Sequence, residues 1–302
     1  MKQTEQTYVI DGQTYSHDRD QLKNKKRVIV KVGSSSLAHP GTDEIDLIKM
    51  EILVREIADL RKRGMDVVLV SSGAMLAGRR ALGYRHRPKE MREKQASAAV
   101  GQARLIMMYQ KLFSEYSETC AQILLTKPNI LNPITRKNAQ NTFDELLRMH
   151  VIPVVNENDT VAVSEFYQVP LLVENDTLAA VLATMIHADL VILLSDIDGL
   201  YTDDPKKSKD AEFIPTVRSE DEKYFKMGKG TSSNVGTGGM QTKLLAASIA
   251  VKSGIDLIIA NGNDFHNVHR IINGRTIGTL FTAGADPNFD LARLLADESQ
   301  QL

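Results

Sequence analysis

The tetrapeptide Glu-Asn-Asp-Thr occurs twice in this chain, at residues 157–160 and again at 174–177. Each copy follows a short apolar run, so each places small polar side chains where a buried strand would end. In an open parallel α/β sheet, ligands bind outside the carboxyl ends of the strands, and Asn and Asp at such ends can hold a substrate. The same residue types are common in turns and helix caps. The repeat alone leaves a binding role and a turn role both open.

A glycine-rich stretch at 236–243 points to a second kind of chemistry, the binding of phosphate. It precedes an apolar run at 244–251 that is typical of a helix. Glycine lets the backbone approach a ligand closely, and the first turn of a helix offers unpaired N–H groups and a positive dipole end to an anion. Its spacing matches neither a Walker A loop nor the dinucleotide fingerprint. Lys243 is expected near the first turns of this helix, where its ammonium group could reach the same anion.

Lys31 interrupts the strand-like run at 27–32, which is otherwise apolar after Arg27. Lysine is almost never buried without a partner. An edge strand or an exposed strand end would explain it. The alternative is a lysine that projects beside Gly33 towards a bound phosphate. Two lysines, two glycine-bearing turns and two Asn-Asp pairs together suggest phosphoryl transfer.

Hydrophobic periodicity predicts the elements that would position these residues. The predicted strands lie at 27–32, 67–70, 122–125, 151–155, 190–194 and 257–260, and the predicted helices at 45–63, after Gly73, and at 88–117, 135–149, 177–187 and 239–253. Strands that are apolar on both faces and alternate with helices imply a mostly parallel sheet covered on both sides. We therefore expect an α/β fold, a three-layer α-β-α sandwich with an open central sheet.

Three segments stand outside this alternation. Residues 161–173 are short, alternating and interrupted by Pro170, which predicts a β-hairpin. Residues 201–230 are rich in Asp, Lys and Gly, which is typical of a mobile lid or insertion. Residues 1–26 are polar and lack the apolar core of a secretion signal, so we expect an extension and not a targeting peptide.

The composition argues against several classes of protein. The chain has 302 residues, of which 42% are hydrophobic and 25% charged, as in ordinary globular proteins. Its 37 Lys and Arg against 38 Asp and Glu give a net charge of -1, so no overall field attracts nucleic acid or anionic membrane. No apolar stretch approaches the roughly 20 residues of a membrane span. We expect a soluble, cytoplasmic protein whose single cysteine, Cys120, is buried and structural.

The candidates for a protein-bound metal site are weak. His266 and His269 are three residues apart on a predicted helix, but no cysteine or third ligand accompanies them. A surface helix explains this pair better. Asp203 and Asp204 are better explained by a turn of the predicted lid. The sequence therefore predicts no metal site built from protein side chains.

A series of short motifs resembles the glutamate 5-kinase family, which belongs to the amino acid kinases. The motifs are, in order, Lys31-Val32-Gly33-Ser34-Ser35, Val70-Ser71-Ser72-Gly73-Ala74, Ala98-Ala99-Val100-Gly101-Gln102, Asn156-Glu157-Asn158-Asp159-Thr160-Val161, Ser195-Asp196 through Tyr201, and Gly236 to Lys243. The resemblance covers about residues 27–282. It implies the amino acid kinase fold as one domain over 27–302, with a substrate-binding half at about 27–185 and a nucleotide-binding half at about 186–285.

The resemblance implies a reaction and a role for single residues. The reaction is transfer of the ATP γ-phosphoryl group to the glutamate side-chain carboxylate, which gives glutamyl 5-phosphate for proline synthesis. Lys31 and Lys243 match lysines that stabilise charge on the phosphoryl group, and Asp176 matches the carboxylate that holds them. Ser72, Asp159 and Asn175 match contacts to glutamate. The residues that match the nucleotide site are Lys31, Ser195, Asp196, Thr237, Gly238, Gly239, Met240, Gln241, Thr242 and Lys243.

The implied chemistry needs no general base. A glutamate carboxylate has an unperturbed pKa of about 4.3 and is already ionised at neutral pH. The obstacle is repulsion between this anion and the triphosphate, so catalysis should rest on alignment and charge neutralisation by lysine and Mg²⁺. We therefore expect Asp176 to organise the lysines. The other implied partners are Mg²⁺ carried by the ATP phosphates, a second copy of the chain in a homodimer or homotetramer, and proline as a feedback inhibitor.

Three features depart from the family pattern on the side that binds the amino acid. Leu172-Val173-Glu174 stands where the family typically has Phe-Gly-Asp, the loop between the two Asn-Asp pairs is a few residues longer, and residues 132–135 replace a commonly acidic and aromatic stretch. A kinase for another small acid, such as acetylglutamate, and a catalytically silent amino-acid sensor are the alternatives. Many relatives continue into a PUA domain, for which we expect no room after Phe281.

Overall fold

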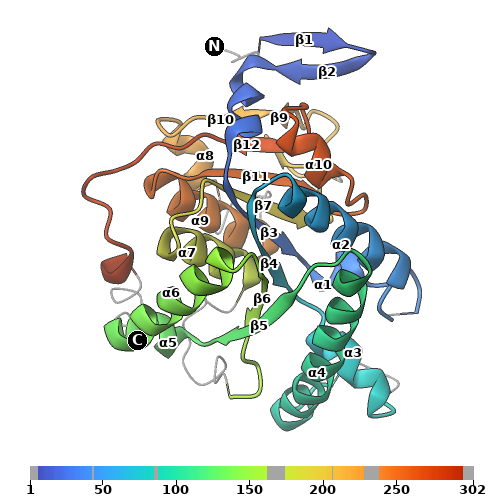
Figure 1. The fold of residues 1–302 in the computed structure, drawn as a ribbon. Helices are drawn as coiled ribbons and strands as arrows, with labels where there is room; N and C mark the ends of the chain where they lie inside the picture. Colours follow the sequence, from blue (N-terminus) through green and yellow to red (C-terminus); the bar gives the residue numbers. More distant parts are fainter. Residues whose placement is uncertain are drawn as a thin grey trace. The chain divides into compact units, whose positions relative to one another are not determined.

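The computed structural model describes residues 6–42, 44–84, 88–161, 174–205, 207–227 and 238–294 (Figure 1). The chain forms two compact units. The first unit contains Met1–Lys31 and Asp176–Leu291, and the second contains Val32–Asn175 and Ala292–Leu302. The chain thus passes from one unit to the other between Lys31 and Val32, and returns between Asn175 and Asp176.

β7 and β11, two long strands of the first unit, run parallel to each other. Its described strands are β1 (Thr7–Ile10), β2 (Gln13–Ser16), β3 (Arg27–Val32, of which Val32 belongs to the second unit), β7 (Leu190–Ser195), β8 (Leu200–Tyr201), β9 (Phe213–Ile214), β10 (Thr216–Val217), β11 (Asp256–Asn261) and β12 (Thr279–Phe281). β7 lies between β3 and β11, and β11 pairs with β7 in parallel, with Asn261 opposite Ser195. The carboxyl ends of these two strands therefore lie side by side.

The helices of the first unit follow or connect these strands. They are the 3-10 helix η1 (His17–Asn24) and the α-helices α7 (Asn175–Met185, of which Asn175 belongs to the second unit), α8 (Glu222–Lys226), α9 (Gly238–Lys252) and α10 (Asn267–Ile272). α7 is largely buried, in keeping with its Leu- and Ala-rich sequence. Asp176 lies in the first turn of α7, so its carboxylate is at the positive end of the helix dipole.

The second unit repeats the alternation of strand and helix. Its described elements are α1 (Ser34–Leu37), α2 (Leu47–Lys62), β4 (Asp66–Ser71), α3 (Ala74–Ala81), α4 (Met91–Glu115), β5 (Cys120–Leu125), α5 (Lys127–Leu131), α6 (Pro133–Arg148) and β6 (Ile152–Glu157). β6 pairs in parallel with both β4 and β5. α3 and α4 cross closely, since a Cβ atom added at Gly78 would lie 1.8 Å from the Ser97 carbonyl oxygen. This contact fixes the helix that follows Ser72 and Gly73.

The predicted strands and main helices are confirmed, with ends that shift by a few residues. The prediction of a mobile lid is wrong for residues 213–217, because β10 pairs in parallel with β12 and Val217 is buried. The predicted hairpin at 161–173 lies outside the described residues except for Val161.

No helix among the described residues is long and apolar enough to cross a membrane. Cys120 is buried as predicted, and burial raises the pKa of its thiol to about 11, which argues against a nucleophile.

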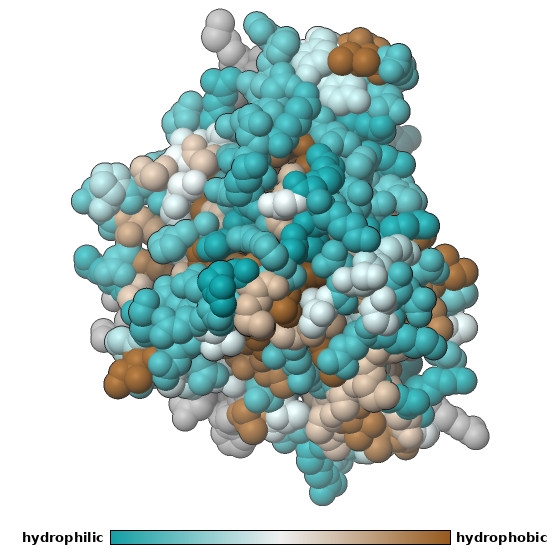
Figure 2. All heavy atoms as spheres, viewed as in Figure 1, coloured by the Kyte–Doolittle hydropathy of each residue, from teal (hydrophilic) through white to brown (hydrophobic). Residues whose placement is uncertain are grey.

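Residues 6–26, expected as a polar extension, fold as part of the first unit. β1 and β2 form a hairpin, and η1 follows with Arg19 and Leu22 fully buried. Lys25 Nζ lies 2.6 Å from Asp256 Oδ2 at the start of β11. Val9 and Ile10 at the end of β1 are exposed. Figure 2 shows apolar surface in the region where Figure 1 draws the hairpin. The segment is therefore attached to the first unit through η1 and Lys25.

Candidate active site

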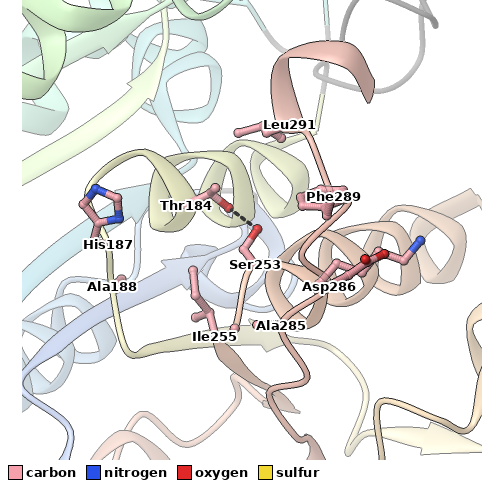
Figure 3. A pocket seen from close by; sticks show the side chains of 11 residues that line it. Thr184, His187, Ala188, Ser253, Ile255, Ala285, Asp286, Phe289 and Leu291 are labelled. Atoms are coloured by element: carbon pink, nitrogen blue, oxygen red, sulfur yellow. Dashed lines mark hydrogen bonds between the residues drawn. The ribbon is translucent and has the colours of Figure 1, made fainter.

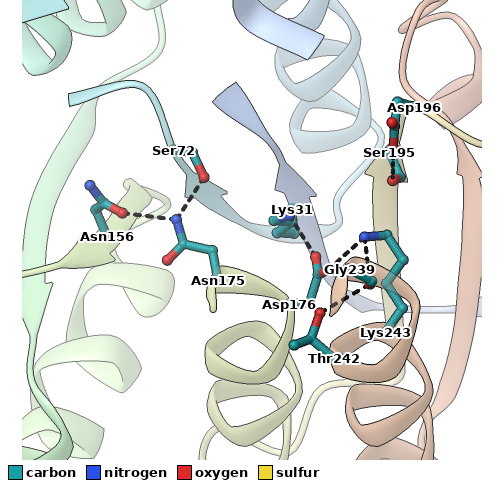
Figure 4. A network of polar contacts seen from close by, with 10 residues as sticks. All are labelled: Lys31, Ser72, Asn156, Asn175, Asp176, Ser195, Asp196, Gly239, Thr242 and Lys243. Carbon is teal, nitrogen blue, oxygen red and sulfur yellow. Dashed lines mark hydrogen bonds and ion pairs between the residues drawn. The ribbon is translucent and has the colours of Figure 1, made fainter. Parts of the chain in front are cut away.

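Lys31, Asp176 and Lys243 meet in the first unit (Figure 4). Lys31 Nζ lies 2.6 Å from Asp176 Oδ1, and Lys243 Nζ lies 3.1 Å from Asp176 Oδ2. The three residues come from the end of β3, the first turn of α7 and the second turn of α9. All three are buried, with exposed fractions of 7%, 1% and 8% in the same order. The edge-strand explanation of Lys31 is therefore wrong, because this lysine is buried against a carboxylate.

This cluster carries an excess of positive charge. Burial favours a neutral Asp176, but the two neighbouring ammonium groups outweigh burial and hold the pKa of this carboxyl below its usual value. Asp176 is therefore ionised at neutral pH, and its lowered pKa makes it a weak base. Two ammonium groups around one carboxylate leave a net charge of about +1, which buried surroundings make costly without an anion. The cluster is thus chemically suited to receive a negatively charged group.

The first turns of α9 lie beside this charge. Lys243 Nζ also donates to the Gly239 carbonyl oxygen at 3.1 Å, and Thr242 Oγ1 donates to the same oxygen at 3.0 Å. Of the predicted glycine-rich nucleotide site, Gly238, Gly239, Met240, Gln241 and Thr242 form the start of α9, whereas Gly236 and Thr237 lie outside the described residues. The unpaired N–H groups of this 15-residue helix are a second feature that favours an anion.

Ser195 and Asp196 lie at the carboxyl end of β7, as predicted. Ser195 is buried, and its Oγ donates to Asp196 Oδ1 at 3.0 Å. The backbone N–H of Gly262, which follows β11, donates to the Ser195 carbonyl oxygen at 2.6 Å. Asn261 Nδ2 donates to Asp198 Oδ1 at 2.6 Å. The loops after two neighbouring parallel strands are therefore tied together where α/β sheets bind ligands.

The second unit holds a separate network of neutral amides (Figure 4). Asn175 Nδ2 donates to Ser72 Oγ at 2.8 Å and to Asn156 Oδ1 at 3.0 Å. Asn156 Nδ2 in turn donates to Gln102 Oε1 at 3.1 Å. The sequence motifs contain both Asn156 and Gln102, but we predicted no role for either. The signal that could have found them is that both are buried polar residues, which need hydrogen-bond partners.

Asp159 does not join this network. Within the described part of the chain, it makes no hydrogen bond to Ser72 or Asn175. Asp159 follows the end of β6 and is partly buried, which raises the pKa of its carboxyl to about 6. Burial and the charge of Asp159 raise the pKa of Glu157 to about 7. Two carboxyl groups that titrate near neutral pH are characteristic of functional sites.

A pocket of about 380 Å³ in the first unit lies away from these residues (Figure 3). It is lined by the carboxyl-terminal ends of α7 and α9 and includes Thr184 and Ser253, whose hydroxyl groups are 2.9 Å apart. Asp176 and Lys243 are nearer the opposite ends of the same helices. Among the described residues, no group of three or more His, Cys, Asp or Glu side chains could hold a metal ion.

Comparison with known proteins supports a kinase. The model of the amino acid kinase family matches residues 26–261. The chain is 49% identical to the glutamate 5-kinase of Carboxydothermus hydrogenoformans over 263 residues, 87% of this chain and 69% of that protein. It is 43% identical to the glutamate 5-kinase of Clostridium perfringens over 265 residues, 88% of this chain and 98% of that protein.

Solved structures with little sequence similarity share the fold. The UMP kinase from Bacillus anthracis superposes with a TM-score of 0.57 at 17% sequence identity. The superposition covers 86% of this chain and 97% of the UMP kinase chain. The UMP kinase from Ureaplasma parvum gives a TM-score of 0.58 at 14% identity, over 85% of this chain and 99% of its own. These matches confirm the predicted fold class. The relatives and the family model together show that the chain belongs to the amino acid kinase family and, within it, to the glutamate 5-kinases.

Proposed function

We propose that this protein transfers the γ-phosphoryl group of ATP to the side-chain carboxylate of L-glutamate. The product is L-glutamyl 5-phosphate, the first intermediate of proline synthesis. The observation that carries this proposal is the buried cluster of Lys31, Asp176 and Lys243, in which two ammonium groups share one carboxylate. Relatives with 41–49% identity that are glutamate 5-kinases supply the substrate class.

The cluster would act on charge and alignment. The attacking carboxylate is already ionised, so the barrier lies in bringing two anions together and in stabilising the transferred phosphoryl group. Lys31 and Lys243 would neutralise charge on that group during transfer, when it is spread over the equatorial oxygens. Asp176 would hold both ammonium groups in place through its two oxygens, at 2.6 and 3.1 Å. It would have no part in proton transfer.

We assign the nucleotide to the first unit. The start of α9, from Gly238 to Thr242, would bind phosphate oxygens through backbone N–H groups, and Lys243 and Lys31 would place their ammonium groups at the phosphate end. Ser195 and Asp196 would contact the nucleotide from the carboxyl end of β7. ATP would enter as its Mg²⁺ complex, with the ion held by phosphate oxygens as part of the substrate.

We assign the amino acid to the second unit. Asn175 donates both of its amide N–H groups to Ser72 and Asn156, so its carbonyl oxygen would accept a hydrogen bond from the ammonium group of glutamate. Asp159 would pair with the substrate ammonium group, since an ionised carboxylate is the natural partner of this cation. The family resemblance also supports a homo-oligomer that responds to proline, and we propose both properties together with this activity.

The role of Asp159 predicts a pH dependence of glutamate affinity. Because the pKa of Asp159 is about 6, its ionised fraction rises as the pH rises from 5 to 7. The KM for glutamate should therefore fall about tenfold over this range, since only the anion attracts the ammonium group. Initial rates at saturating ATP would measure this change. Asp159→Asn should raise this KM and flatten its pH dependence, whereas the matched control Glu157→Gln should keep the transition near pH 6. A transition that survives in Asp159→Asn would remove Asp159 from the amino-acid site.

A test of the proposed function is the release of ADP with different acceptors. ATP and Mg²⁺ are supplied with glutamate, acetylglutamate, aspartate or no acceptor, and we expect rapid release only with glutamate. Preference for acetylglutamate would overturn the assignment of substrate, since acetylation removes the ammonium group that Asp159 is proposed to bind. Binding of glutamate without ADP release from any acceptor would instead support a silent sensor.

A further inference from the structure

Arg19 is a fully buried arginine in η1, in the segment that precedes the family match at residue 26. Its guanidinium group donates to backbone carbonyl oxygens from two distant parts of the chain. Nη2 donates to Pro215 and Gly278 at 2.8 Å each, and Nη1 donates to Ile277 at 2.5 Å. A planar guanidinium with several donors in fixed directions is suited to hold such carbonyl groups together. Arg19 therefore joins the turn before β10 to the turn before β12.

The residue after Gly278 continues this connection through its side chain. Thr279 is fully buried, and its Oγ1 donates to the Ile214 carbonyl oxygen at 2.6 Å. The same Oγ1 accepts the backbone N–H of Leu200 at 2.8 Å. The threonine hydroxyl thus uses one donor and one acceptor function. Ile214 and Thr279 are next in sequence to Pro215 and Gly278, two of the residues whose carbonyl groups Arg19 binds. Arg19 and Thr279 form a continuous link from η1 to Leu200.

Leu200 ends the loop that begins at Ser195, so this link holds one end of the proposed nucleotide loop. Asn261 holds the middle of the loop through Asp198. Gly199 packs so closely on Thr279 that an added Cβ would lie 2.5 Å from its Oγ1. The loop therefore has fixed points on both sides of Gly199. The conformation of the loop therefore depends on the position of Thr279. Thr279 directly follows Gly278, whose carbonyl oxygen accepts a hydrogen bond from Arg19.

We propose that Arg19 is a positioning residue for the nucleotide. By fixing the turns on which Thr279 stands, it presets the loop from Ser195 to Leu200 before ATP binds. This inference rests on the proposed function only in taking Ser195 and Asp196 as nucleotide contacts. It assigns to η1 a role in the affinity for ATP and none in the affinity for glutamate, because all of these residues belong to the first unit.

The test compares variants along this link. Arg19→Met removes the guanidinium donors, and Thr279→Val removes the hydroxyl while keeping the side-chain shape. Thr279→Ser restores the hydroxyl. We expect the first two variants to weaken MgATP binding about tenfold, since Arg19→Met frees the turns next to Thr279 and Thr279→Val removes the bond from Leu200 to Thr279. Thr279→Ser should bind nearly as the parent protein does. Isothermal titration with MgATP measures this, and the KM values for ATP and glutamate are determined in parallel.

Ile271→Val is the matched control. Ile271 is fully buried in α10 of the same unit, and its shortening lowers stability without removing a hydrogen bond. Its KM for ATP should stay unchanged. If Arg19→Met does not fold, the two Thr279 variants still decide the question. Equal MgATP affinity in Thr279→Val and the parent protein would overturn the inference, and so would a loss of affinity that Thr279→Ser shares. Failure of the parent protein itself to bind MgATP would instead count against the proposed function.

Discussion

Lys243→Ala is expected to lower the turnover number about a thousandfold, in line with the loss of one group that stabilises charge in a transition state. In the parent protein, Lys31 and Lys243 both lie against Asp176. Without Lys243, one ammonium and one carboxylate remain, and the cluster loses its excess positive charge. The turnover number at saturating ATP and glutamate measures the loss. The circular dichroism spectrum should be unchanged, because α9 is held by its buried apolar residues.

Lys252→Ala is a matched control for this prediction, because Lys252 is an exposed lysine in the last turn of the same helix. It should keep full turnover. Lys243→Arg separates charge from geometry, since it keeps the positive charge but changes the shape of the group. Near-normal turnover in Lys243→Ala would exclude this lysine from the phosphoryl-transfer step.

Asp176→Asn is expected to lower the free energy of unfolding by about 3–5 kcal/mol, the range found when one partner of a buried ion pair is removed. The two ammonium groups of Lys31 and Lys243 would remain buried with no carboxylate between them. Two ammonium groups that both lie beside residue 176 would repel each other strongly in a medium of low dielectric constant. Urea denaturation at pH 7 measures the loss. Asp144→Asn on the exposed face of α6 is the control and should leave stability unchanged.

The same substitution should alter the response to acid. The pKa of Asp176 is lowered in the folded protein, so its contribution to stability is present above the unfolded value of about 3.9 and is lost as the pH falls through the folded pKa. Asp176→Asn has no such group to protonate. The free energy of unfolding of Asp176→Asn should therefore fall furthest below that of the parent protein near neutral pH. The difference between the two free energies should shrink in acid. A difference that is the same at pH 7 and pH 3 would show that Asp176 is not paired with the lysines.

Sequence patterns predicted the α/β fold because its long elements have strong periodicity. β7 and β11 contain apolar runs of four or more residues, β3 is apolar after Arg27 apart from Lys31, and α2 carries apolar residues at regular helical spacing. Hydrophobic periodicity could not predict the two-residue strands β8, β9 and β10. β10 has two residues and follows Pro215, so no alternation can develop before the strand ends. Its place beside β12 is set by pairing over a long sequence separation.

The family resemblance predicted the residues of the lysine cluster and the role of Asp176 in holding both lysines, whereas the hydrogen bonds of Gln102, Asn156 and Arg19 were not predicted. Lys31 stood out because a lysine inside an apolar run needs a partner, and Asp176 is that partner. Gln102 and Asn156 could not be recognised as a pair, because an amide gives no periodic signal and its partner lies 54 positions away. Arg19 was hidden for the same reason, since its acceptors are backbone carbonyl groups that carry no side-chain signature.

The passage of the chain from Asn175 to Asp176 limits how its length can vary. Asn175 bonds to Ser72 in the second unit, and the next residue bonds to Lys31 in the first. One residue inserted between them would turn α7 by about 100°, because the helix has about 3.6 residues per turn. One of the two side chains would then point away from its partner. Insertions that precede Asn175 leave this phase intact, so natural variation in loop length is expected before this pair and not within it.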